Sequence, residues 1–365
     1  MLDNRFLKNS LGLLGLSLLF SSNMVAANVK LESNHNYLVT ETRPNNIVLV
    51  DLEKNKVINE CKTDEAFSPG GVVLSPDYKV AYILGGYGEE VAGYEVETCK
   101  KVFHTSLTQD NIRAKSLSGI AVNEDGTKVY AIYNRTEMGN DRYTVQDPYF
   151  SVYNVADGLN AKPVKSFVIP RQTTMISTAK DGTVYGVGTH LYEINPKTGE
   201  TKVAIKMRGW GKEGYSDPDS SATYLIGQQK GELTALYTTK EKESEKVYWG
   251  ISSVDLNTKE LTMQEFTEYE TLMFTAIRSP KDANILYGVL NDLTMFDMKE
   301  QKVLKRVIPD HTYYSVVPSA DGDKLYLGGC LDDISVYDAN SLEKIGKIQL
   351  SGDMGSAALQ VFKTK

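Results

Sequence analysis

Seven copies of one short pattern constrain the fold of this chain of 365 residues more than any other feature. In each copy an apolar or aromatic residue is followed by an acid or amide and a second apolar residue, just before a polar turn. The copies are Val50-Asp51-Leu52, Tyr94-Glu95-Val96, Tyr153-Asn154-Val155, Tyr192-Glu193-Ile194, Val254-Asp255-Leu256, Phe296-Asp297-Met298 and Tyr337-Asp338-Ala339. They lie about 40 to 60 residues apart, at or above the length of one four-stranded propeller blade. The pattern therefore predicts seven blades.

Most copies belong to a longer unit with a constant order of turns and strands. A turn such as Ser75-Pro76-Asp77 precedes a β-prone run with an aromatic residue, such as Val80-Ala81-Tyr82. In such turns Asp or Asn bonds its own backbone, and Gly adopts a positive φ. Period-2 alternation and β-branched residues indicate strands rather than helices. We expect an all-β, seven-bladed β-propeller of four-stranded antiparallel blades with YVTN-like repeats, in which the acids of the repeated pattern fix turns.

The two ends of the chain are expected to close the ring. Residues from about Tyr37 to Cys61 supply only three strands, whereas the segment from Gly355 to Phe362 follows the seventh unit and has the character of a lone innermost strand. A closed ring hides the edges of its blades except at the closure itself. We therefore predict that the C-terminal strand completes blade one, and that residues 28–365 form a single domain.

The extreme N-terminus has the composition of an export signal. Arg5 and Lys8 precede an apolar run from Leu11 to Phe20, and small residues follow up to Ala27. The run is short for a membrane span, and the whole segment predicts a signal peptide over residues 1–27 that is cleaved on export to the periplasm. An uncleaved membrane anchor is the alternative. The net charge of -7 argues against nucleic acid as a partner.

The chain has three cysteines, and export would allow them to be oxidised. Cys61 ends the first unit and Cys99 follows a strand of the second, so a disulfide between neighbouring blades is possible, although spacing does not decide it. Cys330 lies in an apolar run and is expected to be a buried, small apolar residue.

No motif for catalysis or metal binding stands out. The sequence contains no Gly-x-Ser-x-Gly elbow, phosphate-binding glycine loop, His-Glu-x-x-His pair or Cys-x-x-Cys-His haem site. The four histidines are not at ligand spacing: His35, His104, His190 and His311. Asp332 and Asp333 are expected in a hairpin turn rather than at a metal. We predict no catalytic residue and no metal site in this chain, which disfavours a lactonase-type hydrolase.

Two stretches depart from the repeat, residues 169–175 and 309–316. Both join the outer strand of one blade to the innermost strand of the next, and in a propeller these crossings share one face of the disc. Aromatic, Arg and Met side chains at the mouth of a channel suit an interface or an apolar pocket. The alternative is that they plug the channel or pack between blades.

Four stretches resemble the β subunit of bacterial quinohemoprotein amine dehydrogenase, and the resemblance extends through the mature chain. They are Pro170-Arg171-Gln172 with Thr174-Met175, the loop from Trp210 to Asp217-Pro218-Asp219, the run from His311 to Val316, and Leu327-Gly328-Gly329. The resemblance implies a periplasmic heterotrimer that oxidises primary amines to aldehyde and ammonia. It also implies that the cofactors lie in partners, with haem c in a two-haem cytochrome α subunit and cysteine tryptophylquinone in a small γ subunit.

By this resemblance, the chain would be a non-catalytic subunit that docks the γ subunit and walls the amine pocket. The residues expected at the partner interface or pocket are Arg171, Gln172, Met175, Trp210, His311, Tyr313 and Tyr314. Two other functions are retained as alternatives: a free-standing exported propeller that binds a ligand or surface partner, and, less favoured, the lactonase-type hydrolase.

Overall fold

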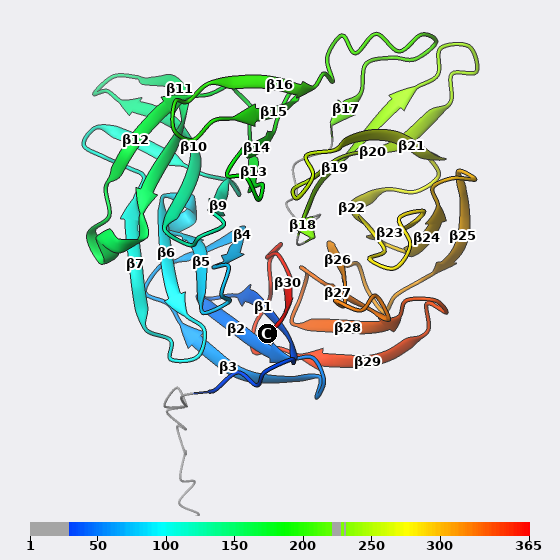
Figure 1. Ribbon diagram of the computed structural model, residues 1–365, viewed down its shortest axis with the longest axis horizontal. Helices are drawn as coiled ribbons and strands as arrows, with labels where there is room; N and C mark the ends of the chain where they lie inside the picture. Colours follow the sequence, from blue (N-terminus) through cyan, green and yellow to red (C-terminus); the bar gives the residue numbers. More distant parts are fainter. Residues whose placement is uncertain (1–28, 221–227, 230) are drawn as a thin grey trace, which may run out of the picture.

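The computed structural model describes residues 29–220, 228–229 and 231–365, which form seven antiparallel β-sheets arranged around a channel (Figure 1). The predicted seven-bladed β-propeller is confirmed. The predicted signal peptide, residues 1–27, lies outside the described residues.

Each blade runs from an innermost strand at the channel to an outermost strand at the rim. Blade 1 contains, in that order, β30 (Gln360–Lys363), β1 (Asn36–Thr42), β2 (Asn46–Asp51) and β3 (Lys56–Lys62). Blade 2 contains β4 (Phe67–Leu74), β5 (Val80–Gly85), β6 (Glu90–Glu95) and β7 (Lys101–Ser106). In blade 3, β9 (Ile120–Val122) and β8 (Ile112–Lys115) both pair with β10 (Lys128–Met138), followed by β11 (Tyr143–Asn154) and β12 (Pro163–Val168). Blade 4 contains β13 (Met175–Thr178), β14 (Val184–Val187), β15 (Leu191–Ile194) and β16 (Thr201–Ile205).

The remaining blades follow the same plan. In blade 5, β18 (Gln228–Gln229) and β17 (Asp219–Ser220) both pair with β19 (Glu232–Lys240), followed by β20 (Val247–Asp255) and β21 (Leu261–Glu268). Blade 6 contains β22 (Met273–Arg278), β23 (Ile285–Leu290), β24 (Leu293–Asp297) and β25 (Lys302–Val307). Blade 7 contains β26 (Ser315–Pro318), β27 (Lys324–Gly328), β28 (Asp333–Asp338) and β29 (Lys344–Gln349). Two short 3-10 turns, η1 (Gly86–Gly88) and η2 (Val155–Asn160), lie between strands.

The aspartates of the repeated pattern fix turns, as expected. They stand at the end of the third strand, and Asp255 is typical: its Oδ1 accepts hydrogen bonds from the backbone N–H groups of Asn257, at 2.7 Å, and Thr258, at 2.9 Å. The same two-amide arrangement occurs at Asp297 and Asp338. Hydrogen bonds from the Thr258 and Asn257 amides lower the pKa of the Asp255 carboxyl, because they stabilise its charged form.

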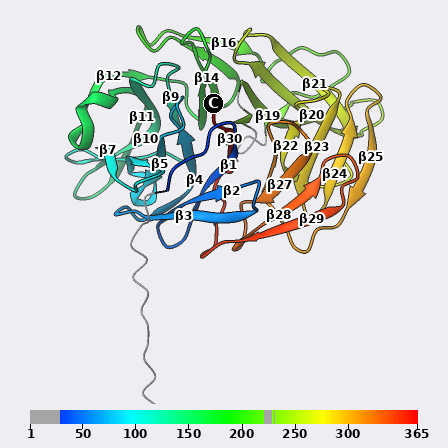
Figure 2. The same ribbon diagram turned by 60° about the horizontal axis from the view of Figure 1, so that its bottom comes forward.

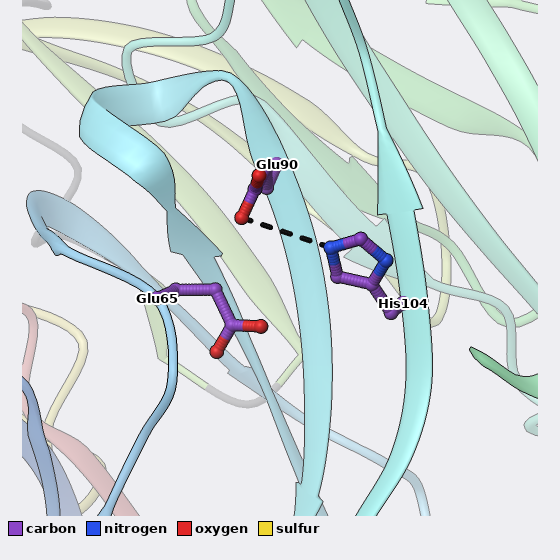
Figure 3. A group of neighbouring side chains, drawn as sticks. All are labelled: Glu65, Glu90 and His104. Carbon is purple, nitrogen blue, oxygen red and sulfur yellow. Dashed lines mark ion pairs between the residues drawn. The ribbon is translucent and has the colours of Figure 1, made fainter. Parts of the chain in front are cut away.

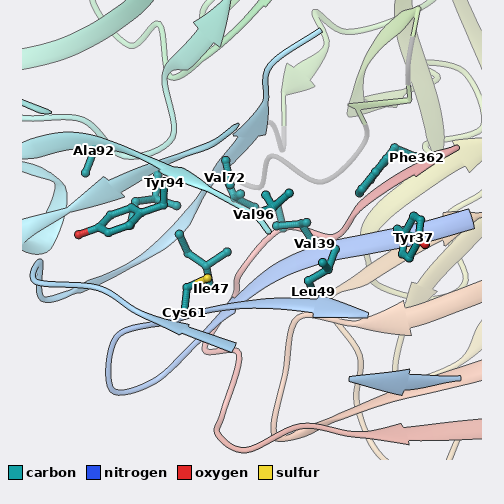
Figure 4. Packing of buried hydrophobic residues seen from close by; sticks show 13 residues of the cluster. Tyr37, Val39, Ile47, Leu49, Cys61, Val72, Ala92, Tyr94, Val96 and Phe362 are labelled. Carbon is teal, nitrogen blue, oxygen red and sulfur yellow. The ribbon is translucent and has the colours of Figure 1, made fainter. Parts of the chain in front are cut away.

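The core of the molecule is divided among the gaps between blades. Each of seven clusters of buried apolar residues combines side chains from two neighbouring blades. Figure 4 shows the cluster between blades 1 and 2, where Tyr37, Val39 and Ile47 face Val72 and Tyr94. A ring of such wedges lets a chain of this size fold as one propeller without one large core.

The C-terminal strand closes the ring, as predicted. Strand β30 pairs with β1 in an antiparallel register that places Phe362 opposite Tyr37 and Gln360 opposite Val39. Both views show β30 beside β1 at the channel (Figures 1 and 2). The side chain of Phe362 is buried, and its ring stacks on that of Tyr78, with ring centroids 4.8 Å apart. The two ends of the chain therefore share the sheet of blade 1.

A disulfide and a buried acid lie at the boundary between blades 1 and 2. Cys61 of β3 is bonded to Cys99 in the turn after β6, which joins the two blades covalently. Cross-strand neighbours share a sheet face, so Glu41, Ile47 and Cys61 all face blade 2. Glu41 is buried, and its Oε2 has no hydrogen-bond partner among the described residues.

We predict that Phe362→Ala destabilises the ring by about 3–5 kcal/mol, the usual cost of removing a buried aromatic side chain. Urea denaturation would measure the change, with Lys363→Ala as the control because that neighbouring side chain is exposed. Deleting residues 354–365 should be more damaging still. Equal stability of the two point variants would show that the C-terminal strand does not hold the ring closed.

The buried carboxyl of Glu41 predicts a pH-dependent effect. Burial raises the pKa of Glu41 well above its usual value, so folding takes up a proton when the pH exceeds the pKa of the unfolded chain. Stability is therefore lost as the pH rises above about 4.3, the usual pKa of Glu. We expect Glu41→Gln to raise the melting temperature at pH 7 and to have little effect at pH 4.

Glu260→Gln is the matched control for the melting-temperature measurement, because Glu260 is exposed. If Glu41→Gln changed the melting temperature equally at both pH values, proton uptake by Glu41 would not explain its effect.

Candidate functional site

The connections between strands define two faces of the disc. Because neighbouring strands are antiparallel, each crossing to the next blade lies on the same face as the hairpin turn between the second and third strands of a blade. We call this the crossing face, and the opposite one the turn face. The predicted site residues belong to crossings or begin the strand after one, so the structure brings all seven to the crossing end of the disc. Their contacts differ, however.

Tyr313 and His311 form a polar network beneath the crossing face with Asp333, at the start of β28. The Tyr313 hydroxyl donates a hydrogen bond to Asp333 Oδ2 at 2.7 Å, and His311 Nε2 lies 2.7 Å from Asp333 Oδ1. Tyr313 and Asp333 are both buried. Burial raises the pKa of the Tyr313 hydroxyl, as does its hydrogen bond to Asp333, although its contact with Ser335 opposes the rise. These contacts together favour the neutral form of the Tyr313 hydroxyl.

Two other blades also bring a tyrosine, an acid and a lysine together, from different strand positions. In blade 2, Glu65 Oε2 accepts a hydrogen bond of 2.6 Å from Tyr94, and Glu65 Oε1 pairs with Lys101. In blade 5, Glu265 accepts a hydrogen bond from Tyr237 and pairs with Lys212 at 2.5 Å. In blade 7, Lys347 Nζ lies 3.6 Å from Asp333 Oδ2, beside Tyr313. Repetition in three blades indicates a structural role for the group.

Tyr314 lies at the channel and not between blades 6 and 7. Its ring centroid is 5.0 Å from that of Phe274, on the innermost strand of blade 6. It also packs against the cluster of blades 4 and 5 that contains the buried Met175. Since Tyr314 enters blade 7, it reaches across the channel to the opposite blades. Tyr314 and Phe274 therefore occupy the crossing end of the channel.

Arg171, Gln172 and Trp210 lie farther toward solvent. Arg171 Nη2 forms an exposed ion pair of 2.9 Å with Asp147, and the Gln172 Oε1 accepts a hydrogen bond of 2.8 Å from Thr189. Gln172 has a φ of +67°, which is uncommon for a residue with a side chain. Trp210 is half-buried against Tyr237, with Lys212 over its ring.

The crossing face also presents a set of exposed apolar side chains that the sequence did not single out as candidate site residues. In the described part of the chain, large exposed apolar residues fall mainly on the outer strands and on this face; Leu159 in η2 is the exception. Those on the crossing face are Tyr87, Leu117, Tyr143, Val145, Tyr269, Leu272, Ile308 and Leu331. Large exposed apolar areas are typical of interaction surfaces. Their only signal in the sequence is an apolar residue at a crossing or hairpin.

The turn face has a cavity of about 620 Å³ at its end of the channel. Its lining is drawn from the innermost strands and includes Tyr78, Ile176, Thr178, Val361 and Phe362. Tyr78 has a φ of +62°, at the turn position where Gly126 and Gly322 adopt +71° in other blades. A left-handed backbone costs a residue with a side chain about 1–3 kcal/mol, so the Tyr78 ring is held at the cavity against strain.

One group of metal-ligand type occurs among the described residues: Glu65, Glu90 and His104 (Figure 3). Their ligand atoms lie within 4.8 Å of one another, and His104 Nε2 is 3.7 Å from Glu90 Oε2. Both oxygens of Glu65 are already engaged, one by the Lys101 ammonium and the other by the Tyr94 hydroxyl. Lys101 thus supplies to Glu65 the positive charge that a metal would bring.

The cysteines are accounted for in the described fold. Cys61 and Cys99 are bonded to each other, and the free Cys330 is half-buried, less than expected. Burial raises the pKa of the Cys330 thiol, which leaves it a poor nucleophile. Asp333, expected in a hairpin turn, instead begins β28 and holds Tyr313.

Comparison with solved structures gives the fold and nothing narrower. The chain is similar to dihydro-heme d1 dehydrogenase NirN in complex with DHE, at 16% identity and a TM-score of 0.54, over 92% of this chain and 76% of that one. It is also similar to apo AztD from Citrobacter koseri, at 13% identity and a TM-score of 0.53, over 90% of this chain and 98% of that one. A third similar structure is Kuenenia stuttgartiensis hydrazine synthase, at 13% identity and a TM-score of 0.53, over 90% of this chain and 99% of that one.

No family model and no curated protein matches the sequence. Within the described residues, no helix has the length and apolar character needed to cross a membrane. Any functional assignment must therefore rest on the architecture of the propeller and on the chemistry of its two faces.

We predict that Lys101→Met destabilises the protein by about 3–5 kcal/mol at pH 7, because it leaves the buried Glu65 carboxylate without a cation. Burial opposes ionisation of Glu65, but its bonds to Lys101 and Tyr94 outweigh burial and lower its pKa. In the wild type, the stability that Glu65 gains from Lys101 and Tyr94 is present above the pKa that Glu65 has in the unfolded chain. It is lost as the pH falls below that value. The loss in the variant should thus be smaller at pH 4 than at pH 7.

Urea denaturation at the two pH values would test this prediction. The exposed Lys79–Asp77 pair offers a control, since Lys79→Met should cost about 1 kcal/mol or less. Adding Glu65→Gln to Lys101→Met should restore part of the stability. A loss that is independent of pH would contradict the electrostatic role given to Lys101.

Proposed function

We propose that this chain is the non-catalytic propeller subunit of a periplasmic, amine-oxidising complex of the quinohemoprotein amine dehydrogenase type. Its crossing face would dock the small quinone-bearing subunit and form one wall of the amine pocket. The observation that carries the proposal is that the family-like stretches and the exposed apolar side chains lie on the same face. The four stretches that resemble the family's β subunit are far apart in sequence, yet all reach the crossing face, where the exposed apolar side chains also gather.

The contacts divide the predicted site residues into two layers. Arg171 and Gln172 are exposed at the face and Trp210 is half-buried there, so a partner would meet a guanidinium, an amide and part of an indole ring. Such groups, together with exposed apolar side chains on the same face, are typical of protein interfaces. Met175 and Tyr313 are buried and would support the face from below, and His311 would act through Asp333. Tyr314 would close the channel behind the docked partner.

Under this proposal the cofactors would lie on other chains, and the cysteines of this chain support that assignment. Cysteine tryptophylquinone and haem c both need cysteine linkages, and two of the three cysteines here are joined to each other. When bound in a partner, the quinone accepts electrons from the primary amine, and the haems carry them away. This chain would position the quinone subunit, cover the pocket and exclude water from it.

A second function is favoured by the cavity on the turn face. A hollow of about 620 Å³, lined by polar as well as apolar groups, is large enough for a small ligand, and the strained Tyr78 stands at its wall. A free-standing exported propeller that binds a small molecule would use this cavity and would need no partner on the crossing face.

The docking proposal predicts the effect of placing charge at two apolar positions that flank blade 6. Leu272 and Ile308 are exposed on the crossing face, and Leu304 is comparably exposed to Leu272 on the outer strand of the same blade. We expect Leu272→Asp with Ile308→Asp to reduce co-purification of the haem and quinone subunits, and amine-dependent dye reduction, by about tenfold or more. Leu304→Asp should change neither.

The melting temperatures of both variants should match the wild type, since all three positions are at the surface. Unchanged assembly and amine turnover in the double variant would contradict docking at this face.

A further inference from the structure

The hairpin of β10 and β11 extends beyond the sheet of blade 3 and leaves an open strand edge. Strand β12 pairs with β11 only along residues 149–153. The outer part of β11, from Tyr143 to Gln146, pairs with β10 on one side only. Strand β8 pairs with the far side of β10. The other side of this part of β11 has no strand among the described residues. The side chains of Tyr143 and Val145 are 71% and 65% exposed.

The hairpin register determines which backbone groups face the open side. The Gly139 N–H donates to the Arg142 carbonyl at 2.9 Å, so this pair is hydrogen-bonded across the hairpin. Hydrogen-bonded and non-hydrogen-bonded pairs alternate in an antiparallel ladder. The next pair, Met138 with Tyr143, is therefore non-bonded, as is Thr136 with Val145. The N–H and C=O groups of Tyr143 and Val145 consequently point away from β10.

This edge lacks the protection found at the other edges of the molecule. Charged side chains, lysine above all, prevent sheet edges from pairing with other chains. Every outer strand of the seven blades has at least one; examples are Lys62, Lys101, Lys165, Lys202, Glu265, Lys305 and Lys347. The segment from Tyr143 to Gln146 has none. It combines an aromatic and two β-branched residues, a composition that favours strand pairing.

We propose that this edge pairs antiparallel with the same edge of a second copy of the chain, so that the propeller forms a two-fold dimer through β11. With Val145 opposite the second copy's Val145, the two residues exchange two backbone hydrogen bonds. Thr144 then faces the second copy's Gln146, and Tyr143 faces its Asp147. Two-fold dimers, whose interfaces are isologous, are the commonest soluble homo-oligomers.

The segment is self-complementary, which favours a second copy as the occupant. In this register no like charges stand opposite each other, because Asp147 faces a tyrosine and is already paired with Arg171 at 2.9 Å. The apolar Val145 meets an identical residue, and the polar Thr144 and Gln146 meet each other. Cross-strand pairs of these types stabilise sheets. The inference does not depend on the proposed function.

Size-exclusion chromatography with light scattering on the full exported chain would test the dimer. We expect a concentration-dependent dimer whose dissociation constant rises about tenfold or more in Val145→Lys, because the lysine charge blocks the edge. Val164→Lys, on β12 of the same blade, is the matched control, since Val164 is 48% exposed but lies on a different edge. A wild-type protein that stays monomeric, or a dimer unaffected by Val145→Lys, would overturn the proposal.

Cysteine substitution tests the register separately. Hydrogen-bonded residues in an antiparallel pair have Cα atoms about 5.5 Å apart, within the range that a disulfide spans. Val145→Cys should therefore form a disulfide-linked dimer under mild oxidation, and Thr144→Cys should not, because Thr144 faces Gln146. The wild type controls for the free Cys330. Crosslinking through position 144 but not 145 would rule out this register.

Discussion

The pairing of β30 with β1 is the constraint on which the rest of the structure depends. It brings the last strand of the chain into the first blade and aligns Phe362 with Tyr37. The same strand lines the channel and stacks on Tyr78, so closure and the shape of the cavity rest on one set of contacts. Without closure, blades 7 and 1 would expose the apolar cluster that they now share.

The sequence predicted features that repeat or lie close together in the chain. Six acids and one amide before polar turns were enough to predict seven blades, because the aspartates among them accept hydrogen bonds from backbone amides two or three residues away. The C-terminal strand was predictable because the first unit lacked one. By contrast, Asp333 holds Tyr313 from 20 residues away, and Lys101 neutralises Glu65 from 36 residues away. Such pairs depend on the folded blades, and no local pattern identifies them.

The two faces of the disc have different physical characters. Beneath the crossing face, tyrosine, acid and lysine groups fix the strands with strong hydrogen bonds, and apolar side chains stand exposed above them. A rigid lower layer reduces the loss of conformational entropy when a partner docks. At the turn face the channel opens as a cavity instead. Partner docking and small-ligand binding would therefore use opposite sides of the same molecule.

Purification of the tagged protein from periplasmic extract tests the central claim most directly, with mass spectrometry of the co-eluting chains and an amine-dependent dye-reduction assay on the same fraction. Our account predicts a stable complex with a two-haem cytochrome c and a small, crosslinked quinone subunit, active towards primary amines. A colourless, inactive protein that purifies without those subunits would contradict it and favour a binding propeller that acts alone.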